Sequence, residues 1–300
     1  MQLPPYLKQG DTIAIVAPAR KISREALAPA IQLIEKLGFK VKSGLNLYEE
    51  SDQFAGTDSQ RRSDFQEMLN DEQVKAILCA RGGYGSLRVA EGLNFTGFAK
   101  NPKWIIGYSD ITVFHNLLNN IGVSSLHATM PINFPEQVCE NESTISLFRI
   151  ISGQDVNYIG GKHSLNRTGR SEGELLGGNL SMLYSLRGTN YDIETAGKIL
   201  FIEDLDEYLY HIDRMMMNLK SGGVMKNLKG LIVGGVTDMN DNNIPFGKTA
   251  EEIIREVVEE YDYPVLFGFP AGHQEPNLAL LFGQKISLDI SELGYKIYYI

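Results

Sequence analysis

The sequence has few cysteines and no excess of positive charge. Only Cys79 and Cys139 occur among its 300 residues, and Cys79 ends an apolar run that is typical of a buried strand, so we expect no disulfide framework. The net charge of −9 and the pI of about 5.2 argue against a nucleic-acid partner, because binding to a phosphate backbone requires clustered Lys and Arg.

Signals for membrane insertion and secretion are also missing. No apolar run is long enough to span a bilayer. The first residues, Met1 to Tyr6, contain neither the basic region nor the apolar region of a signal peptide. We therefore expect a cytoplasmic protein with no membrane partner.

The motifs of common cofactor and metal sites are absent. The Gly-rich segment Arg81–Ser86 lacks both the G-x-G-x-x-G spacing of a dinucleotide fingerprint and the Gly-Lys-Ser/Thr of a P-loop. The segment from Asp238 begins like a calcium loop, but Asn243 and Thr249 at its sixth and twelfth positions exclude an EF-hand. No Cys/His cluster has the spacing of zinc ligands. We expect no cofactor and no metal ion.

The first half of the chain alternates short apolar runs with helical patterns. Strands are predicted at 12–16, 39–42, 74–80, 103–108 and 124–129. This alternation indicates a parallel sheet with helices on both faces, so residues 1–152 are expected to form a flavodoxin- or Rossmann-like α/β domain. Such sheets carry their sites at the carboxyl ends of the strands, here just after residues 16, 80, 108 and 129.

The second half is expected to form a smaller α/β domain over residues 171–300, with residues 153–170 as an aperiodic linker. Its predicted strands are 198–203, 228–235, 264–268 and 296–300, and its predicted helices are 208–220 and 249–261. Residues 278–283 and 285–290 are interpreted as a hairpin.

Ser109 is the candidate nucleophile, because it lies where a buried strand turns directly into a helix. A serine at such an elbow projects its hydroxyl from the sheet edge, and the helix N-terminus directs free N–H groups at developing negative charge. The turn around Gly83 follows a neighbouring strand and could supply a second N–H donor to an oxyanion. The alternatives are that Ser109 or Asp110 only caps the helix and that the glycines only form a tight turn.

A serine nucleophile requires a base and an acid that orients it. Among the five histidines, His273 is the best candidate, because it alone follows the end of a predicted strand in a loop. Glu203 ends another apolar strand, where a carboxylate needs a partner, and is the candidate acid. The neighbouring acids Asp204, Asp206 and Glu207 are interpreted mostly as a solvated loop.

These segments together resemble the LD-carboxypeptidase family of serine peptidases. The resemblance covers nearly the whole chain, and the order and spacing of its motifs are jointly specific. The motifs are Leu7–Pro18, Arg81–Ser86, Gly107–Asp110, Gly177–Leu180, Glu203 and Ala271–His273. Leu126–Pro131 departs from the His-Gly-Pro-like stretch expected there, in a wall of the pocket.

The resemblance implies that Ser109 is the nucleophile, His273 the general base and Glu203 its orienting acid. The N–H of Asp110 and that of a glycine in the Gly82-Gly83 turn, which we take to be Gly83, would form the oxyanion hole. The triad would be assembled across the interface between two domains, and the protein would be a homodimer.

Two activities occur in the family. One branch removes the terminal D-alanine from muropeptide tetrapeptides in cell-wall recycling, and another cleaves peptide-nucleotide antibiotics of the microcin C type and confers immunity. The stretch from Asn179 to Leu200 is short and has no evident aromatic element for stacking a nucleobase, which favours a muropeptide substrate. The residues alone also permit an unrelated esterase or amidase, or a non-catalytic two-domain binder of small molecules.

Overall fold

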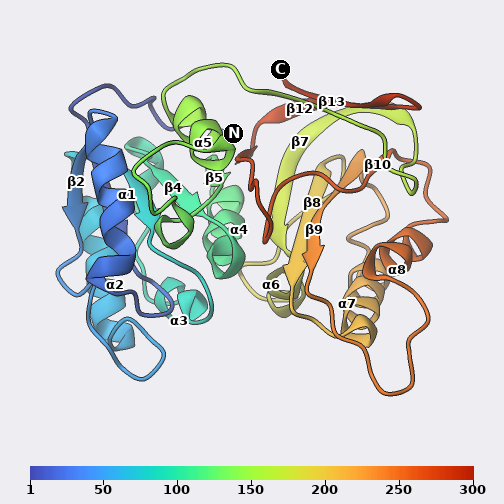
Figure 1. Cartoon of the computed structure of the whole chain (residues 1–300), viewed down its shortest axis with the longest axis horizontal. Coiled ribbons are helices and arrows are strands. Elements are labelled where there is room, and N and C mark those ends of the chain that lie inside the picture. The colour runs from blue at the N-terminus through green and yellow to red at the C-terminus, as the bar shows by residue number, and fades with distance from the viewer.

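Two β-sheets lie side by side and organise the protein. The computed structural model describes residues 1–300. Figure 1 shows the N-terminal half with its sheet on the left and the C-terminal half with the other sheet on the right. This arrangement confirms the mixed α/β class predicted from the sequence.

The first sheet has six strands in the order β11-β5-β4-β3-β1-β2. Its parallel strands are β1 (Thr12–Val16), β2 (Lys40–Ser43), β3 (Val74–Cys79), β4 (Trp104–Gly107) and β5 (Ser125–His127). The order 2-1-3-4-5 is that of flavodoxin-like sheets, in which ligands bind outside the carboxyl ends of the strands. The strands and their carboxyl ends lie where the sequence predicted them.

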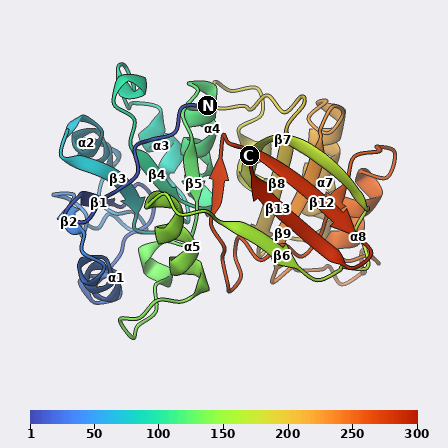
Figure 2. The same ribbon diagram turned by 90° about the horizontal axis from the view of Figure 1, so that it is seen from above.

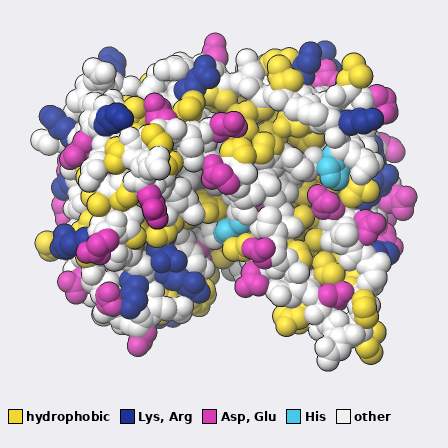
Figure 3. Space-filling view, in the orientation of Figure 1, with side chains coloured by type: hydrophobic (Ala, Val, Ile, Leu, Met, Phe, Trp, Pro, Cys, Tyr) yellow, Lys and Arg dark blue, Asp and Glu magenta, His cyan; other side chains and the backbone are white.

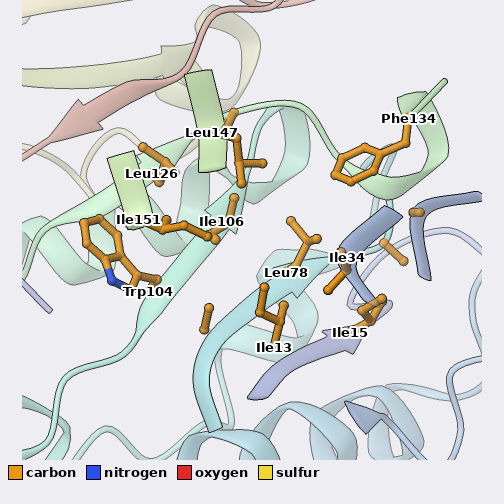
Figure 4. Close-up of a cluster of buried hydrophobic side chains, with 14 of the residues drawn as sticks. Ile13, Ile15, Ile34, Leu78, Trp104, Ile106, Leu126, Phe134, Leu147 and Ile151 are labelled. Atoms are coloured by element: carbon orange, nitrogen blue, oxygen red, sulfur yellow. The ribbon is translucent and has the colours of Figure 1, made fainter. Parts of the chain in front are cut away.

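Helices cover both faces of this sheet, as Figure 2 shows. They are α1 (Arg24–Lys36), α2 (Asp58–Asn70), α3 (Ser86–Ala90), α4 (Thr112–Asn120) and α5 (Glu142–Ile151). One apolar cluster joins the strands to α1 and α5, and a second joins them to α2, α3 and α4. In the first cluster, Leu78 and Ile106 of the strands face Ile34 of α1 and Leu147 of α5 (Figure 4). Burial on both faces explains why the strands are continuous apolar runs.

The second sheet has seven strands in the order β10-β9-β8-β7-β12-β13-β6. Strands β7 to β10 are parallel, whereas β7, β12, β13 and β6 pair in antiparallel fashion. The bounds are β6 (Asn157–Gly160), β7 (Gly169–Asn179), β8 (Ile199–Leu205), β9 (Gly230–Thr237), β10 (Val265–Leu266), β12 (Lys285–Ser291) and β13 (Gly294–Tyr299). The helices are α6 (Leu180–Ser185), α7 (Leu209–Ser221) and α8 (Ala250–Val257), and 3-10 turns occur at Phe98–Lys100, Ser109–Ile111 and Pro131–Asn133.

The hairpin predicted near the C-terminus is wrong. Strand β11 (Leu280–Phe282) pairs with β5 of the first sheet, whereas β12 pairs with β7 and β13 of the second. Residues 153–170 also contain strand β6, where no strand was expected. The division into 1–152, 153–170 and 171–300 stays a proposal, and β11 places a late segment of the chain in the first sheet.

Candidate active site

Ser109 lies at a strained elbow between β4 and α4. Its φ is 65°, in the left-handed region that non-glycine residues adopt at a cost of roughly 1–3 kcal/mol. The elbow also requires glycine at position 107, where an added Cβ would lie 2.8 Å from Cγ1 of Ile111. The geometry therefore resembles a nucleophile elbow, with strand, sharp turn and helix in direct succession.

The Gly-rich turn after β3 lies against this elbow. A Cβ added to Gly82 would be 3.0 Å from Cβ of Ser109 and 3.4 Å from the backbone nitrogen of Asp110. The next residue, Gly83, has a φ of 115°, which side-chain-bearing residues rarely adopt. Glycine at both positions thus allows the backbone of the turn to approach Ser109 closely.

Two buried charged side chains hold the turn in place. The carboxylate of Asp110, whose residue is 3% exposed, accepts a hydrogen bond of 2.7 Å from the backbone N–H of Ser86. Arg61 of α2 is 2% exposed and donates to the backbone oxygens of Gly85, at 3.1 Å, and of Pro18. Arg61 therefore connects the loop after β1 to the Gly-rich turn after β3.

His273 and Glu203 form a hydrogen-bonded pair. Glu203 is on β8 and fully buried, and His273 is in the loop after β10. Nδ1 of His273 lies 2.6 Å from Oε2 of Glu203, which also accepts the backbone N–H of His273 at 3.1 Å. Burial alone would lower the pKa of His273, but the charge of Glu203 and its hydrogen bond outweigh burial and raise this pKa above its usual value.

Asp204 differs from the solvated residue expected from the sequence. It is 2% exposed, and its carboxylate accepts hydrogen bonds from Nδ2 of Asn179 at 2.8 Å and from the backbone N–H of Ser181 and of Leu205, both at 2.9 Å. Burial and the neighbouring charge of Glu203 raise its pKa to about 7. The interpretation of Asp204 as part of a solvated loop was wrong, because the acidic segment 204–207 contains the change from a buried strand to an exposed loop.

A cleft of about 440 Å³ brings these groups together. Figure 3 shows the hollow between the two halves. Ser109, the Gly82-Gly83 turn, Asp110 and His273 all line it, and Glu203 lies behind His273. Its other lining residues are Arg20, Arg81, Tyr108, Met130, Ile132, Asn133, Asn179, Ser181, Met182, Asp204, Leu205, Asp206 and Glu207. The residues that follow β1, β3, β4 and β5 thus meet at one edge, as predicted.

The other four histidines lie outside this cleft. His115 is buried in α4 and hydrogen-bonds to Ser125 and to the backbone oxygen of Gly107. His127 is buried in β5 among aromatic rings, His163 stacks on Phe267, and His211 pairs with Glu207. No group of three or more His, Cys, Asp or Glu side chains is arranged to hold a metal ion, and no helix is long and apolar enough to cross a membrane.

Sequence reasoning did not single out Arg20, Arg61 or Arg81 as site residues. Arg20 and Arg81 line the cleft, and Arg61 fixes two of the loops that form it. For Arg20 and Arg81 a signal existed, because both follow the ends of predicted strands. The sequence contains no such signal for Arg61, because this residue lies within a helix and only the tertiary structure shows what the helix packs against.

The chain matches known proteins along most of its length. Residues 13–128 match the model of the LD-carboxypeptidase N-terminal domain, and residues 172–288 match that of the LD-carboxypeptidase C-terminal domain. The probable murein peptide carboxypeptidase of Bacillus subtilis is 36% identical over 96% of this chain and 92% of its own. The murein tetrapeptide carboxypeptidase of Pseudomonas aeruginosa is 28% identical over 94% of both chains.

Solved structures show the same fold. The muramoyltetrapeptide carboxypeptidase of Oxalobacter formigenes superposes with a TM-score of 0.87 at 26% identity, over 96% of this chain and 98% of its own. The microcin C7 self-immunity protein MccF of Escherichia coli is 26% identical over 97% of this chain and 94% of its own. The two matched domain models together span more than half of the chain. The chain therefore belongs to the LD-carboxypeptidase family and is a serine peptidase.

Proposed function

We propose that this peptidase removes the terminal D-alanine from murein tetrapeptides, with Ser109 as nucleophile, His273 as general base and Glu203 as the acid that orients it. One observation carries the proposal: His273, which Glu203 holds from behind, and the strained Ser109 elbow belong to different sheets and line the same cleft. A solvent-facing helix cap would need neither the strain nor the buried pair. The division of the triad between the two halves agrees with a substrate bound between them.

The proposed reaction follows from the positions of these groups. Oγ of Ser109 attacks the carbonyl carbon before D-alanine while Nε2 of His273 takes its proton. The N–H groups of Gly83 and Asp110 stabilise the oxyanion that forms. The C–N bond then breaks as His273 returns the proton to the amine of the departing D-alanine. Water, activated by the same histidine, hydrolyses the acyl-Ser109 ester and releases the tripeptide.

The substrate class rests on the relatives. Those from Bacillus subtilis and Pseudomonas aeruginosa are named for murein peptides and murein tetrapeptides, and each matches nearly the whole chain. A function in cell-wall recycling in the cytoplasm, as a homodimer, is part of the same proposal. It predicts that the enzyme acts on wall fragments returned to the cell.

A peptide-nucleotide substrate of the microcin C type is the second candidate, because MccF has the same fold. The segment between Asn179 and β8 argues against this substrate. This segment contains only the short helix α6, and neither of its aromatic residues, Tyr184 and Tyr191, lines the cleft. No aromatic side chain of this segment is therefore available to stack a nucleobase in the cleft.

Mass spectrometry of a muropeptide tetrapeptide mixture tests the proposal. We expect incubation with the protein to remove one alanine, and Ser109→Ala to abolish this loss while the protein stays folded. Ser185→Ala is the matched control, because it removes an exposed hydroxyl from α6 outside the cleft. A fluorophosphonate probe should label the wild type and the control but not Ser109→Ala. A folded Ser109→Ala variant with wild-type turnover would exclude Ser109 from the mechanism.

A further inference from the structure

Two arginines converge on the N-terminal side of the cleft. Arg20 follows β1 and Arg81 follows β3, and these strands are hydrogen-bonded neighbours in the sheet. Both side chains line the cleft that contains Ser109 and His273. In Figure 3, Lys and Arg side chains gather on the N-terminal side of the hollow, while Asp and Glu side chains lie on its other side.

Neither arginine has a carboxylate partner within the protein. Arg81 donates only to the backbone oxygen of Lys21, at 3.1 Å, and Arg20 forms no side-chain hydrogen bond or ion pair. The neighbouring Lys21 is paired, with Glu50 at 2.6 Å. Burial and the positive charge of Arg20 lower the pKa of Arg81, with no carboxylate acting in the opposite direction. Two cations that line a cleft and form no ion pair with a carboxylate can bind an anion.

Arg20 lies against the same Gly82-Gly83 turn that contacts Ser109. A Cβ added to Gly83 would be 2.5 Å from Cδ and 2.9 Å from Nε of Arg20, so the side chain of Arg20 passes directly over the turn. A Cβ added to Gly82 would be 3.2 Å from Oγ of Ser109. A carboxylate bound by Arg20 would therefore lie on the side of the cleft that carries this turn and Ser109.

The opposite wall cannot bind this carboxylate. Asp204, Asp206 and Glu207 line it, and none of them forms an ion pair with a lysine or arginine. A second anion beside Asp206 and Glu207 would be repelled, because like charges at close range are unfavourable. The charges of the two walls therefore set the direction in which a peptide lies in the cleft.

We propose that Arg20 and Arg81 bind the free α-carboxylate of the C-terminal residue of the peptide and so restrict the enzyme to removing single terminal residues. This inference rests on the proposed peptidase function and adds the group that is recognised. A guanidinium group can bind a carboxylate through two parallel N–H···O bonds, which fixes its orientation as well as its charge. An internal peptide bond offers no carboxylate at this position.

The experiment compares two substrates that differ only in the recognised group: the muropeptide tetrapeptide with a free terminal carboxylate and the same peptide as its C-terminal amide. The wild type should cleave the free acid with a kcat/KM at least about 100-fold higher, since the amide leaves both guanidinium groups without an anionic partner. Arg81→Gln should lower kcat/KM for the free acid by about 100-fold and leave the amide nearly unchanged. Arg20→Gln should act in the same direction.

Lys21→Gln is the matched control, because it removes a cation from the same loop but outside the cleft. It should preserve the wild-type preference for the free acid. Equal losses for both substrates in Arg81→Gln would overturn the inference, since they indicate a general structural effect. A wild type without preference between acid and amide would overturn it as well.

Binding to Ser109→Ala, measured by calorimetry, separates this inference from the proposed function. Tighter binding of the free acid than of the amide supports carboxylate recognition even if the wild type hydrolyses neither peptide, in which case only the proposed function fails. Cleavage of both peptides at equal rates supports the peptidase function and rejects the carboxylate site. Failure of Ser109→Ala to bind either peptide rejects the carboxylate site.

Discussion

A single carboxylate oxygen of Glu203 holds His273 twice, through the ring nitrogen Nδ1 at 2.6 Å and through the backbone N–H at 3.1 Å. This leaves Nε2 as the free ring nitrogen of a side chain that lines the cleft. The contact also requires Gly272, where an added Cβ would lie 2.6 Å from Cβ of Glu203. Ring and backbone are fixed together, so the orientation of the imidazole does not depend on bound substrate.

Replacing Glu203 by Gln should lower kcat by about two to four orders of magnitude with a smaller change in KM. The amide keeps the shape but lacks the charge that stabilises the imidazolium formed during attack, and its NH₂ can favour the wrong tautomer. His273→Ala should lose at least as much, and the double variant should be little worse than the worse single one. Losses that multiply would indicate that Glu203 binds substrate instead.

Activity should fall at acidic pH, and the inflection of this fall should lie above the usual pKa of a histidine. The base must be neutral to accept the proton of Ser109, and Glu203 raises the pKa of His273 against the effect of burial. The kcat/KM of the wild type should therefore decline as the pH falls through an inflection above about 6.5. Asp204 also raises this pKa, so Asp204→Asn should move the inflection to lower pH. An inflection unchanged by Asp204→Asn would contradict the assigned coupling.

The sequence could predict those parts of the fold that have local causes. Ser23 and Thr57 cap α1 and α2 with side-chain oxygens, as such residues commonly do, and the β-branched run of β1 forms a strand where it was predicted. Strand β7 was missed because Gly169–Asn179 is rich in glycine and polar at its start, and only its pairing with β8 and β12 makes it a strand. The pairing of β11 with β5 joins segments about 150 residues apart, which no local pattern records.

The site was predictable to the extent that it depends on strand ends. Ser109 and His273 follow strands, and Glu203 lies near the end of one, so topology places each at the carboxyl end of a strand, and the packing of the two sheets brings them to one cleft. Burial of Asp204 and the contacts of Arg61 depend on which surfaces close over them, and the sequence has no sign of either. The sequence also gives no sign that Arg20 and Arg81 form no ion pair with a carboxylate, because ion pairing depends on the packed structure.

His115 should make the protein less stable as the pH falls below about 6.5. Burial lowers its pKa to about 4, so between about pH 6.5 and pH 4 the unfolded chain binds a proton at this histidine that the folded protein does not bind. This stability is fully present above the unfolded value and is lost towards pH 4, to a total of about 3 kcal/mol. Urea unfolding at pH 7.5 and pH 5 should show a smaller loss for His115→Gln than for the wild type. Equal losses in the two proteins would contradict the assignment.

Arg61→Lys should slow catalysis although the residue does not line the cleft. One ammonium group replaces a guanidinium that reaches the backbone oxygens of both Pro18 and Gly85, so the Gly-rich turn loses part of its attachment. Because the turn carries the proposed oxyanion donor Gly83, we expect kcat to fall by about 10- to 100-fold while KM changes little. Arg62→Lys is the matched control on the same helix, since the side chain of Arg62 hydrogen-bonds only to the backbone oxygen of Arg88, outside the cleft. The rate of labelling by a fluorophosphonate probe should fall in Arg61→Lys in parallel with kcat, because the probe also places negative charge in the oxyanion hole. A lower melting temperature with unchanged kcat and labelling would mean that Arg61 stabilises the fold without positioning the turn.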